Sequence, residues 1–218
     1  MAADAGRPRS RAATRERVLD GALEVFLERG FGRSTPEQIC ARAGFTRGAF
    51  YSNFSSMDEV FLALWERQAE GVVTRVREAV DSVHYGDGDG RPFIDVVVSV
   101  LTGLVGDVSW HVLTAEFGAH AARNPAVAAI VTQHRSALRD ALRPMIVRGL
   151  ALYGREVAVD DDTMGRSVVA AYEGAMAQAM IEPGNPVPAR LAVELIATII
   201  WSYSRVSKPA RTAGESRG

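Results

Sequence analysis

The sequence predicts an all-α protein of about nine helices, in which a small N-terminal three-helix module precedes a larger helical body. Apolar residues recur at intervals of three and four along most of the chain, which is helical spacing. Helix starts and stops are marked by capping residues, prolines and glycines. No segment alternates apolar and polar residues as a half-buried strand would. With 218 residues, 47% of them hydrophobic and 23% charged, the composition is that of an ordinary globular protein.

The first predicted helix covers residues 14–29. It follows a segment, 1–13, that we expect to be a flexible basic arm because Arg7, Arg9 and Arg11 surround a proline. Gly30 ends the helix. The apolar positions that define its buried stripe are Val18, Ala22, Val25 and Phe26.

The second predicted helix covers residues 36–43 and has the clearest start in the chain. Thr35 can cap it, Pro36 occupies its first position, and Gln38 completes a capping box. Gly44 ends it, because glycine readily adopts the left-handed conformation of a tight turn.

A short third helix over 47–54 follows almost at once, with Thr46 as its cap. Ser55 is then expected to cap a fourth helix, with Asp58 as its capping-box partner, and this helix reaches about Val83.

The rest of the chain is predicted to be helical between turns rich in glycine, proline and aspartate. One helix begins at Pro92, and another carries Trp110, Leu113 and Phe117. A long helix follows Pro125, and Pro144 is expected to kink it. The eighth begins after Asp160, and the ninth covers about 188–205. The domains expected from these boundaries are the arm (1–13), a three-helix N-terminal domain (14–56), a helical body (57–206) and a disordered tail (207–218).

The spacing of the second and third helices, with two residues between Ala43 and Thr46, is that of a helix-turn-helix. Phe50 and Phe54 lie four residues apart and can pack against the first two helices. Arg47 and Tyr51, also four apart, project from a different side. Small residues in the first turn would let the backbone approach a groove floor.

These residues predict DNA binding. A recognition helix reads base edges with its N-terminal residues, and arginine bidentate to guanine is the commonest specific contact, so Arg47 is the expected base reader. Phosphate contacts position the helix without reading sequence. The candidates for them are Thr35, Thr46, Tyr51, Ser52 and Asn53.

The distribution of charge agrees with this assignment. Through Met57 there are nine arginines and six acids, a net charge of +3, whereas the whole chain carries −1, which leaves −4 for the remainder. A basic end on an acidic body is typical of a modular nucleic-acid binder.

The first quarter of the chain also closely resembles the N-terminal domain of the tetracycline-repressor (TetR/AcrR) family, without a gap. The matching positions are Ala22, Phe26, Gly30, Phe31, Thr35, Ile39, Ala43, Gly44, Gly48, Phe50, Tyr51, Phe54 and Phe61. The resemblance implies a dimeric, usually repressing regulator whose reading heads leave the operator when an effector enters the helical body. The DNA contacts that it implies are Thr35, Thr46, Arg47, Gly48, Ala49, Tyr51, Ser52 and Asn53.

The sequence departs from that family at two positions. Met57 stands where the family usually has a lysine that contacts phosphate; methionine cannot supply this contact, and the arginine arm is a candidate to compensate for it. Cys40 stands where alanine is usual, and we interpret it as a small core residue.

For the effector, we expect a small, mostly apolar or aromatic molecule. A few polar or amphipathic side chains sit on otherwise apolar stripes, next to aromatic residues, which is the usual composition of a small-molecule site. Each of them alone is more often an ordinary core residue. The predicted ligand-binding residues are Trp65, Gln68, Trp110, Phe117, His134 and Tyr172.

We expect a homodimer through the eighth and ninth helices. The ninth is apolar almost all round, so both of its sides must be covered. The eighth carries a strip of Ala171, Ala175 and Ala179 that permits close helix approach. The alternative is that the ninth helix is simply central to a monomer.

Other function classes have little support in the sequence. A single cysteine excludes an intrachain disulfide framework and a multi-cysteine zinc site. Glu116 and His120 have metal-ligand spacing, but a third ligand is not apparent, so no metal or cofactor is expected. No nucleophile–base pair or phosphate loop predicts an enzyme. No apolar run is long enough to span a membrane, and the N-terminus lacks a secretory signal, so a cytoplasmic location is expected.

Two alternatives stay open. One is a helical enzyme or ligand carrier whose N-terminal module no longer binds DNA, for which Met57 is the only support. The other is a DNA-binding regulator that a protein partner controls and that has no effector cavity.

Overall fold

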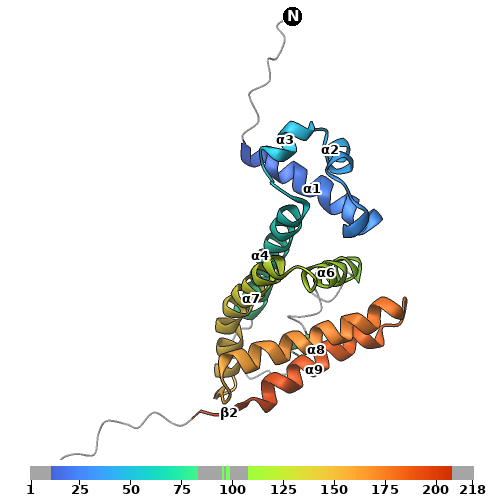
Figure 1. Cartoon of the computed structure of the whole chain (residues 1–218). Helices are drawn as coiled ribbons and strands as arrows, with labels where there is room; N and C mark the ends of the chain where they lie inside the picture. The colour runs from blue at the N-terminus through green and yellow to red at the C-terminus, as the bar shows by residue number, and fades with distance from the viewer. Residues whose placement is uncertain (1–10, 83–94, 96, 99–107, 208–218) are drawn as a thin grey trace, which may run out of the picture. The chain divides into compact units, whose positions relative to one another are not determined.

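The computed structural model describes residues 11–82, 95, 97–98 and 108–207. Within these residues the chain forms eight α-helices, one short 3₁₀ helix and two short strands (Figure 1). The elements, in order, are α1 (Arg11–Arg29), η1 (Phe31–Arg33), α2 (Pro36–Ala43), α3 (Arg47–Tyr51), α4 (Met57–Ser82), α6 (Val108–Ala121), α7 (Pro125–Ala151), β1 (Arg155–Val157), α8 (Asp161–Ile181), α9 (Val187–Ser202) and β2 (Ser204–Val206). The predicted helix that begins at Pro92 lies almost wholly outside the described residues.

The described residues divide into two compact units. The first takes its residues from Met1–Val72 and Asp107–Ser136, and the second from Val73–Gly106 and Ala137–Gly218. Both long helices, α4 and α7, therefore contribute one part to each unit, and α6 belongs with the N-terminal helices.

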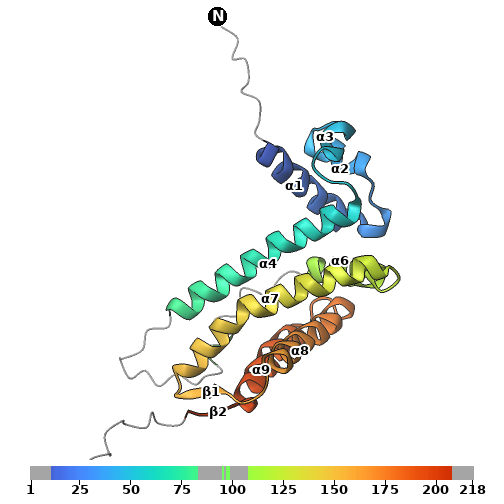
Figure 2. The same cartoon turned by 60° about the vertical axis from the view of Figure 1, so that its left-hand side comes forward.

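In the first unit, α1, α2 and α3 pack as a three-helix cluster (Figures 1 and 2). The apolar stripe predicted for α1 is buried, with Val18, Ala22 and Phe26 at most 1% exposed. A second helix can approach closely because α1 presents Gly21, where a Cβ would lie 3.0 Å from that of Ala43. The core predicted for the N-terminal module is thus present.

Aromatic rings extend this core from the module to α6. Phe61 of α4 stacks on Phe117 of α6, with ring centroids 3.9 Å apart, and on Trp110 at 5.8 Å. Phe31 meets the edges of Phe61 and Phe117 at 5.6 and 4.9 Å. Because these rings come from three elements, η1, α4 and α6 form one packed body.

In the first unit, three helix boundaries differ from the predicted ones. Helix α1 begins at Arg11, so this arginine belongs to the helix, while Arg7 and Arg9 lie outside the described residues. Helix α3 ends at Tyr51, although the Phe54 amide still donates to the Phe50 carbonyl. Helix α4 is capped by Ser56, whose hydroxyl oxygen accepts from the Glu59 amide at 3.1 Å, instead of by Ser55.

The second unit is built around α8 and α9, which lie side by side (Figures 1 and 2). Their contact buries Ala175 and Ala179 of α8 with Ala192 and Ile196 of α9. The alanine strip of α8 therefore serves the packing of the two helices within one chain. Asp160 caps α8, since its carboxylate accepts from the Thr163 amide at 2.9 Å.

A small antiparallel sheet, which was not predicted, closes the second unit. Strand β1 pairs with β2, with Glu156 opposite Arg205. Arg155 lies across the end of α9, donating to the Ser204 hydroxyl and carbonyl, each at 2.7 Å, and covering the Trp201 ring at 4.1 Å. The predicted ninth helix was therefore too long, because residues 204–206 are extended.

Pro144 lies inside α7, and the helix continues past it to Ala151. None of the described helices is both long enough and apolar enough to cross a membrane.

Candidate nucleic-acid interface

The turn between α2 and α3 follows from local chemistry. The Thr35 hydroxyl accepts from the Gln38 amide at 3.4 Å, and the Gln38 side chain accepts from the Thr35 amide at 3.0 Å, so the predicted capping box is confirmed. Gly44 has a φ of 72°, in the left-handed region that disfavours other residues. The Thr46 hydroxyl then accepts from the Ala49 amide and starts α3. These contacts fix the helix-turn-helix.

Helix α3 is short, and its aromatic residues hold it in place. Phe50 and Phe54 are at most 1% exposed. The guanidinium of Arg15 lies 5.1 Å from the centre of the Phe54 ring. Tyr51, one residue beyond Phe50, is half exposed. The division of α3 into a buried aromatic side and an outer side is therefore confirmed.

The residues predicted to contact DNA lie mainly on that outer side. Six are exposed, whereas Ala49 and Asn53 are partly buried. The exposed ones are Thr35, Thr46, Arg47, Gly48, Tyr51 and Ser52. They come from the start of α2, the turn and α3, so one continuous stretch of the module presents them.

Arg47 is held by two neighbours. Its Nη1 atom lies 3.0 Å from Oε1 of Glu37 on α2, and its Cζ atom lies 5.9 Å from the centre of the Tyr51 ring. Contact with the Tyr51 side chain, followed by the charge of Glu37, raises the pKa of Arg47 above its ordinary value. The pKa of the Glu37 carboxyl is lowered by hydrogen bonds, first from its own backbone amide and then from the Thr35 hydroxyl. The positive charge of Arg47 lowers it further. The pair is therefore fully charged at neutral pH.

The end of α3 carries a small polar cluster. The Asn53 side-chain amide donates to the Ala49 carbonyl at 2.8 Å, and the Ser52 hydroxyl donates to the same carbonyl at 2.9 Å. The Arg11 guanidinium donates to the Ser52 carbonyl at 2.9 Å. Asn53 Oδ1 is buried and accepts no hydrogen bond from the described residues. Arg11 thus closes the end of α3 from the first turn of α1.

Both departures from the family pattern have structural counterparts. Met57 is partly buried and packs against the aromatic core. Cys40 is 5% exposed, and burial raises the pKa of its thiol. The interpretation of Cys40 as a core residue agrees with these facts.

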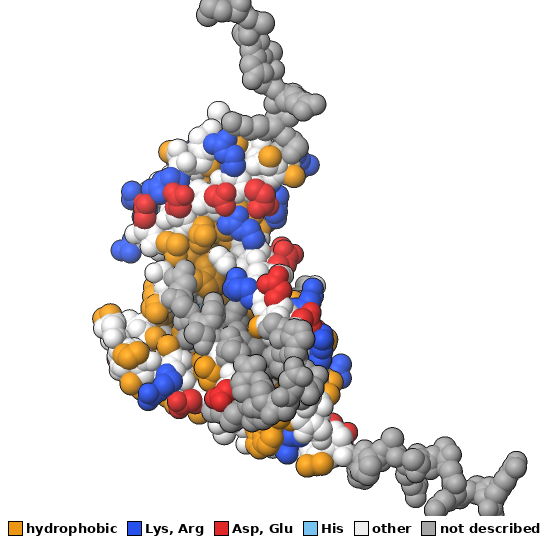
Figure 3. All heavy atoms as spheres, turned by 180° about the vertical axis from the view of Figure 1, so that it is seen from behind, with side chains coloured by type: hydrophobic (Ala, Val, Ile, Leu, Met, Phe, Trp, Pro, Cys, Tyr) orange, Lys and Arg blue, Asp and Glu red, His pale blue; other side chains and the backbone are white. Residues whose placement is uncertain are grey.

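The acidic residues of α1 are paired with arginines. Arg42 of α2 binds Glu24 at 2.8 Å and Glu28 at 2.7 Å. Arg67 of α4 binds Asp20 at 2.8 Å and Glu16 at 3.4 Å. Seen from behind, acidic side chains form a row bordered by basic ones (Figure 3). These acids therefore have arginine partners other than Arg47.

The structure brings some of the predicted ligand-binding residues together. The ring of Trp65 on α4 stacks on that of His134 on α7 at 6.0 Å, and His134 Nδ1 lies 3.4 Å from Glu66 Oε1. Gln68, one turn after Trp65, is partly buried. Trp110 and Phe117 belong to the aromatic core described above, where Phe117 is 2% exposed. Tyr172 belongs to α8, in the second unit.

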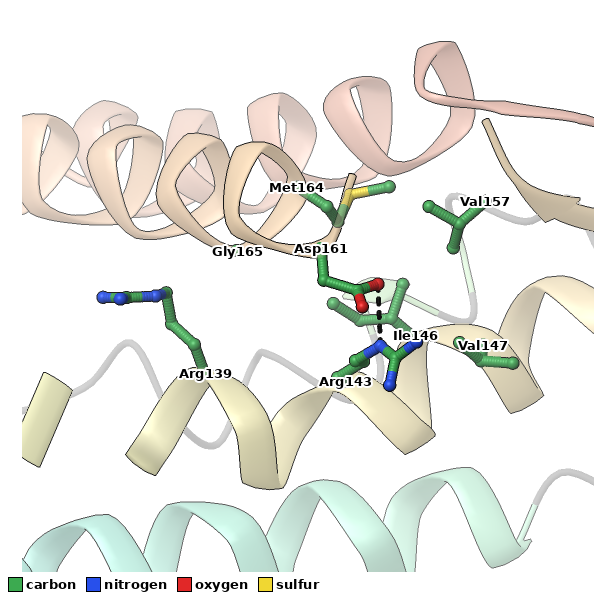
Figure 4. Close-up of a pocket in the computed structure, with 8 residues that line it drawn as sticks. All are labelled: Arg139, Arg143, Ile146, Val147, Val157, Asp161, Met164 and Gly165. Atoms are coloured by element: carbon green, nitrogen blue, oxygen red, sulfur yellow. Dashed lines mark ion pairs between the residues drawn. The ribbon is translucent and has the colours of Figure 1, made fainter. Parts of the chain in front are cut away.

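Hollows among the described residues include the following two. One, in the second unit, has a volume of about 20 Å³, enough for a water molecule. As Figure 4 shows, Arg143 reaches across it to Asp161, at 2.7 Å, among Ile146, Val157 and Met164. The other is an open groove of about 250 Å³ between the end of α1 and α6, lined by Leu27, Gly30, Arg33, Val112 and Glu116 among others.

Glu116 and His120 have structural partners. The Glu116 carboxylate accepts from the Phe31 amide at 2.8 Å. His120 Nε2 lies 3.0 Å from Asp58 Oδ1, although the two are not aligned for a hydrogen bond. No group of three possible metal ligands occurs in the part of the chain that the structure describes. Both residues connect α6 to the N-terminal helices.

A helix-turn-helix that presents an arginine at the start of its second helix defines a reading head of the kind found in transcription regulators. Comparison with known proteins agrees. Residues 18–64 match the family described as bacterial regulatory proteins, tetR family, and residues 88–201 match the tetracyclin repressor-like C-terminal domain. The chain belongs to the tetR family of bacterial regulatory proteins.

Individual relatives are distant. The HTH-type transcriptional regulator UidR of Escherichia coli K12 is 29% identical over 119 residues, 54% of this chain and 57% of UidR. The aligned region is thus little more than half of that relative. Salmonella enterica GusR has the same fold, with a TM-score of 0.66 at 20% identity over 90% of this chain and 100% of GusR. Bacillus subtilis FadR, whose structure was solved in complex with stearoyl-CoA, has a TM-score of 0.65 at 14% identity. The alignment covers 85% of this chain and 97% of FadR.

Proposed function

We propose that this protein is a ligand-responsive transcription regulator that binds operator DNA as a homodimer and leaves it when a small molecule binds. The observation that carries the proposal is the outer side of α3. Arg47, Tyr51 and Ser52 are exposed there, on a helix that Phe50 and Phe54 anchor from behind. Such a helix can enter the major groove without disturbing the core of the module.

Roles within this surface follow from chemistry. Arg47 reads a guanine, because its guanidinium can donate two parallel hydrogen bonds to O6 and N7. The small residues Gly48 and Ala49 allow the backbone to come close to the DNA. Phosphates are contacted by Thr35, Thr46, Tyr51, Ser52 and Asn53. Asn53 Oδ1, which lacks a donor among the described residues, would gain one from an ordered water at the interface.

An exposed apolar face on α8 and α9 supports dimerisation. Ala170, Gly174, Ala177 and Ile181 follow each other at intervals of three and four on α8, and all are exposed. On α9, Val187 and Leu195 are 48% and 38% exposed. In a two-fold dimer the same patch faces its own copy, so these two helices and their twins form a four-helix seam.

The effector site includes Trp65, Gln68 and His134. A planar apolar molecule can replace His134 on the Trp65 ring, and Gln68 and Glu66 offer polar partners nearby. Trp110 and Phe117 take part through the aromatic core, which they share with Phe61. Tyr172 stays a candidate on α8.

Contacts within the first unit can transmit a structural change from the effector site to the reading head. Glu116 binds the Phe31 amide and His120 approaches Asp58, so a shift of α6 changes the support of η1 and of the start of α4. Because a dimer must fit half-sites at a fixed distance, a small change in the two heads lowers DNA affinity. By linkage, the effector binds the DNA-free protein more tightly by the same factor.

DNA binding is tested by selecting duplexes from a random-sequence library with the full chain and measuring affinity against salt. We expect a preferred sequence and a steep fall in affinity with salt, since phosphate contacts release counterions. A protein that enriches no sequence and shows no salt-dependent binding to duplex DNA would contradict the proposal.

The effector site is tested with anilinonaphthalene sulfonate, a planar aromatic probe. The wild type should bind it and lose operator affinity, whereas Trp65→Ala should weaken probe binding. Trp201→Ala is the control, because Trp201 is an exposed tryptophan of the second unit. Equal binding by all three proteins would count against a site at Trp65.

A further inference from the structure

Glu37 is an acidic residue on a surface that is otherwise suited to phosphate. It is the second residue of α2, next but one to Thr35, a proposed phosphate contact. Its side chain is 50% exposed. A carboxylate at this place repels the DNA backbone, so its presence calls for an explanation other than affinity.

The carboxylate is directed at the arginine that is proposed to read bases. Oε1 of Glu37 lies 3.0 Å from Nη1 of Arg47, across the turn between the two helices. Among the described acids of the N-terminal module, those on α1 pair with Arg15, Arg42 and Arg67, none of which is a proposed DNA contact. Glu37 is the one that pairs with a proposed contact.

Stability does not explain the pair. Both side chains are at least half exposed, and ion pairs in water contribute little because solvent screens the charges. The Glu37–Arg47 pair instead affects the geometry of the Arg47 side chain. An arginine side chain is long and flexible, and in contact with DNA it can bind the nearest phosphate as readily as a base.

The contact with Glu37 is made through Nη1. Arginine carries five N–H donors in a planar fork, so the edge formed by Nε and Nη2 keeps donors that this contact does not use. The Tyr51 ring, 5.9 Å away, limits movement on a second side. Two donors on that edge match the O6 and N7 acceptors of guanine.

We propose that Glu37 is a positioning residue for sequence specificity: it restrains Arg47 from phosphates and presents the Nε–Nη2 edge of its guanidinium to a guanine. This inference rests on the proposed DNA binding. It implies that Glu37 lowers affinity for all DNA, and that it lowers affinity for non-operator DNA the most.

The test compares wild type with Glu37→Gln in the full-length protein. The probes are a duplex that the wild type selects from a random library and a scrambled duplex of the same composition, each titrated over a range of salt concentrations. In Glu37→Gln, Arg47 is free to bind phosphate. The slope for the scrambled duplex should steepen by about 0.9 for each new phosphate contact. The ratio of selected to scrambled affinity should fall by about tenfold.

Two controls separate positioning from charge. Glu24→Gln removes an acid of similar exposure from the same module, and Arg42 keeps its second partner, Glu28. Both duplexes should then gain affinity equally and the ratio should stay as in wild type. In an Arg47→Ala background, Glu37→Gln should leave the ratio unchanged, because the residue that it positions is gone.

Several outcomes would overturn the inference. Equal changes in the affinities for the two duplexes in Glu37→Gln and Glu24→Gln would mean that Glu37 acts only through its contribution to the net charge. A loss of selected-duplex affinity alone would make Glu37 a direct reader of a base. A fall in the ratio that persists without Arg47 would exclude positioning. A wild type that selects no sequence would instead defeat the proposed function itself.

Discussion

The reading head and the α8–α9 pair present outer surfaces of opposite chemistry. On the head, the residues around α3 are polar or charged, with Arg47 at the centre. On α8 and α9, exposed positions include Ile181, Val187 and Leu195. The first surface suits phosphates and base edges, and the second suits another apolar surface. The proposed function therefore assigns two kinds of binding site to one chain, and single substitutions can separate them.

The largest effect is expected from a charge on the apolar face. Leu195→Glu would place a carboxylate in the dimer seam once on each side, because a two-fold interface presents every residue twice. A loss of about 3 kcal/mol in the free energy of dimer association would raise the dissociation constant of the dimer about a hundredfold. Sedimentation at micromolar concentration should then show monomer.

Leu27→Glu is the matched control for this change. Leu27 is 40% exposed, close to the 38% of Leu195, but lies on α1 in the first unit. It should leave the dimer intact. A wild type that sediments as a monomer would contradict the seam, and so would a Leu195→Glu protein that stays dimeric.

The next effect concerns the charged surface. Arg47→Ala should reduce affinity for the selected duplex by roughly tenfold to a hundredfold per half-site, while affinity for scrambled DNA changes little. Arg42→Ala removes an arginine whose partners are acids of α1, so it should not alter sequence preference. Footprints of equal affinity for wild type and Arg47→Ala would show that another residue reads the base.

A smaller effect is expected where α6 supports the head. Gly30 has a φ of 81°, and a Cβ there would lie 2.6 Å from Oε2 of Glu116. Gly30→Ala should therefore strain the backbone and disturb the hydrogen bond from the Phe31 amide to the Glu116 carboxylate, at a cost of about 1–3 kcal/mol in the free energy of unfolding.

Gly32→Ala provides the comparison, because nothing lies within 4 Å of a Cβ at that position. Urea unfolding should place Gly32→Ala within about 0.5 kcal/mol of wild type. If the two variants unfold alike, Glu116 does not constrain the chain at Gly30.

The smallest effect tests the departure at position 57. Met57→Lys should add a phosphate contact at the start of α4, with the lysine stem packing where methionine packs now. The slope of log affinity against log salt should steepen by about 0.9 per head, for selected and scrambled duplexes alike. An unchanged slope would mean that this position does not face phosphate.

Local signals made the head predictable from sequence, and their ambiguity explains where prediction was off by one. Thr35, Gln38 and Gly44 act within a few residues, so the capping box and the turn could be read directly. Around Ser55 the predicted register, Ser55 with Asp58, was off by one. The Ser56 hydroxyl accepts from the Glu59 amide instead, and the Glu59 carboxylate accepts from the Ser55 amide at 2.6 Å.

Contacts between distant residues could not be read in this way. The strands β1 and β2 have three residues each and are far apart in the sequence, so no alternation of residue types revealed them. The pairing of Glu37 with Arg47 depends on the angle between two helices. Periodicity likewise predicted that Phe117 is buried, but not that it stacks on Phe61 at the support of the head.

The central claim is that two copies of α3 bind operator DNA side by side. A hydroxyl-radical footprint of the full-length protein on the DNA that flanks its own gene tests it most directly. The account predicts two protected half-sites on one face of the duplex, with centres about one or a few helical turns apart. Protection should be lost in Arg47→Ala, and neither half-site should be protected by a Leu195→Glu monomer at the same concentration. Uniform protection, equal to that of scrambled DNA, would contradict the account.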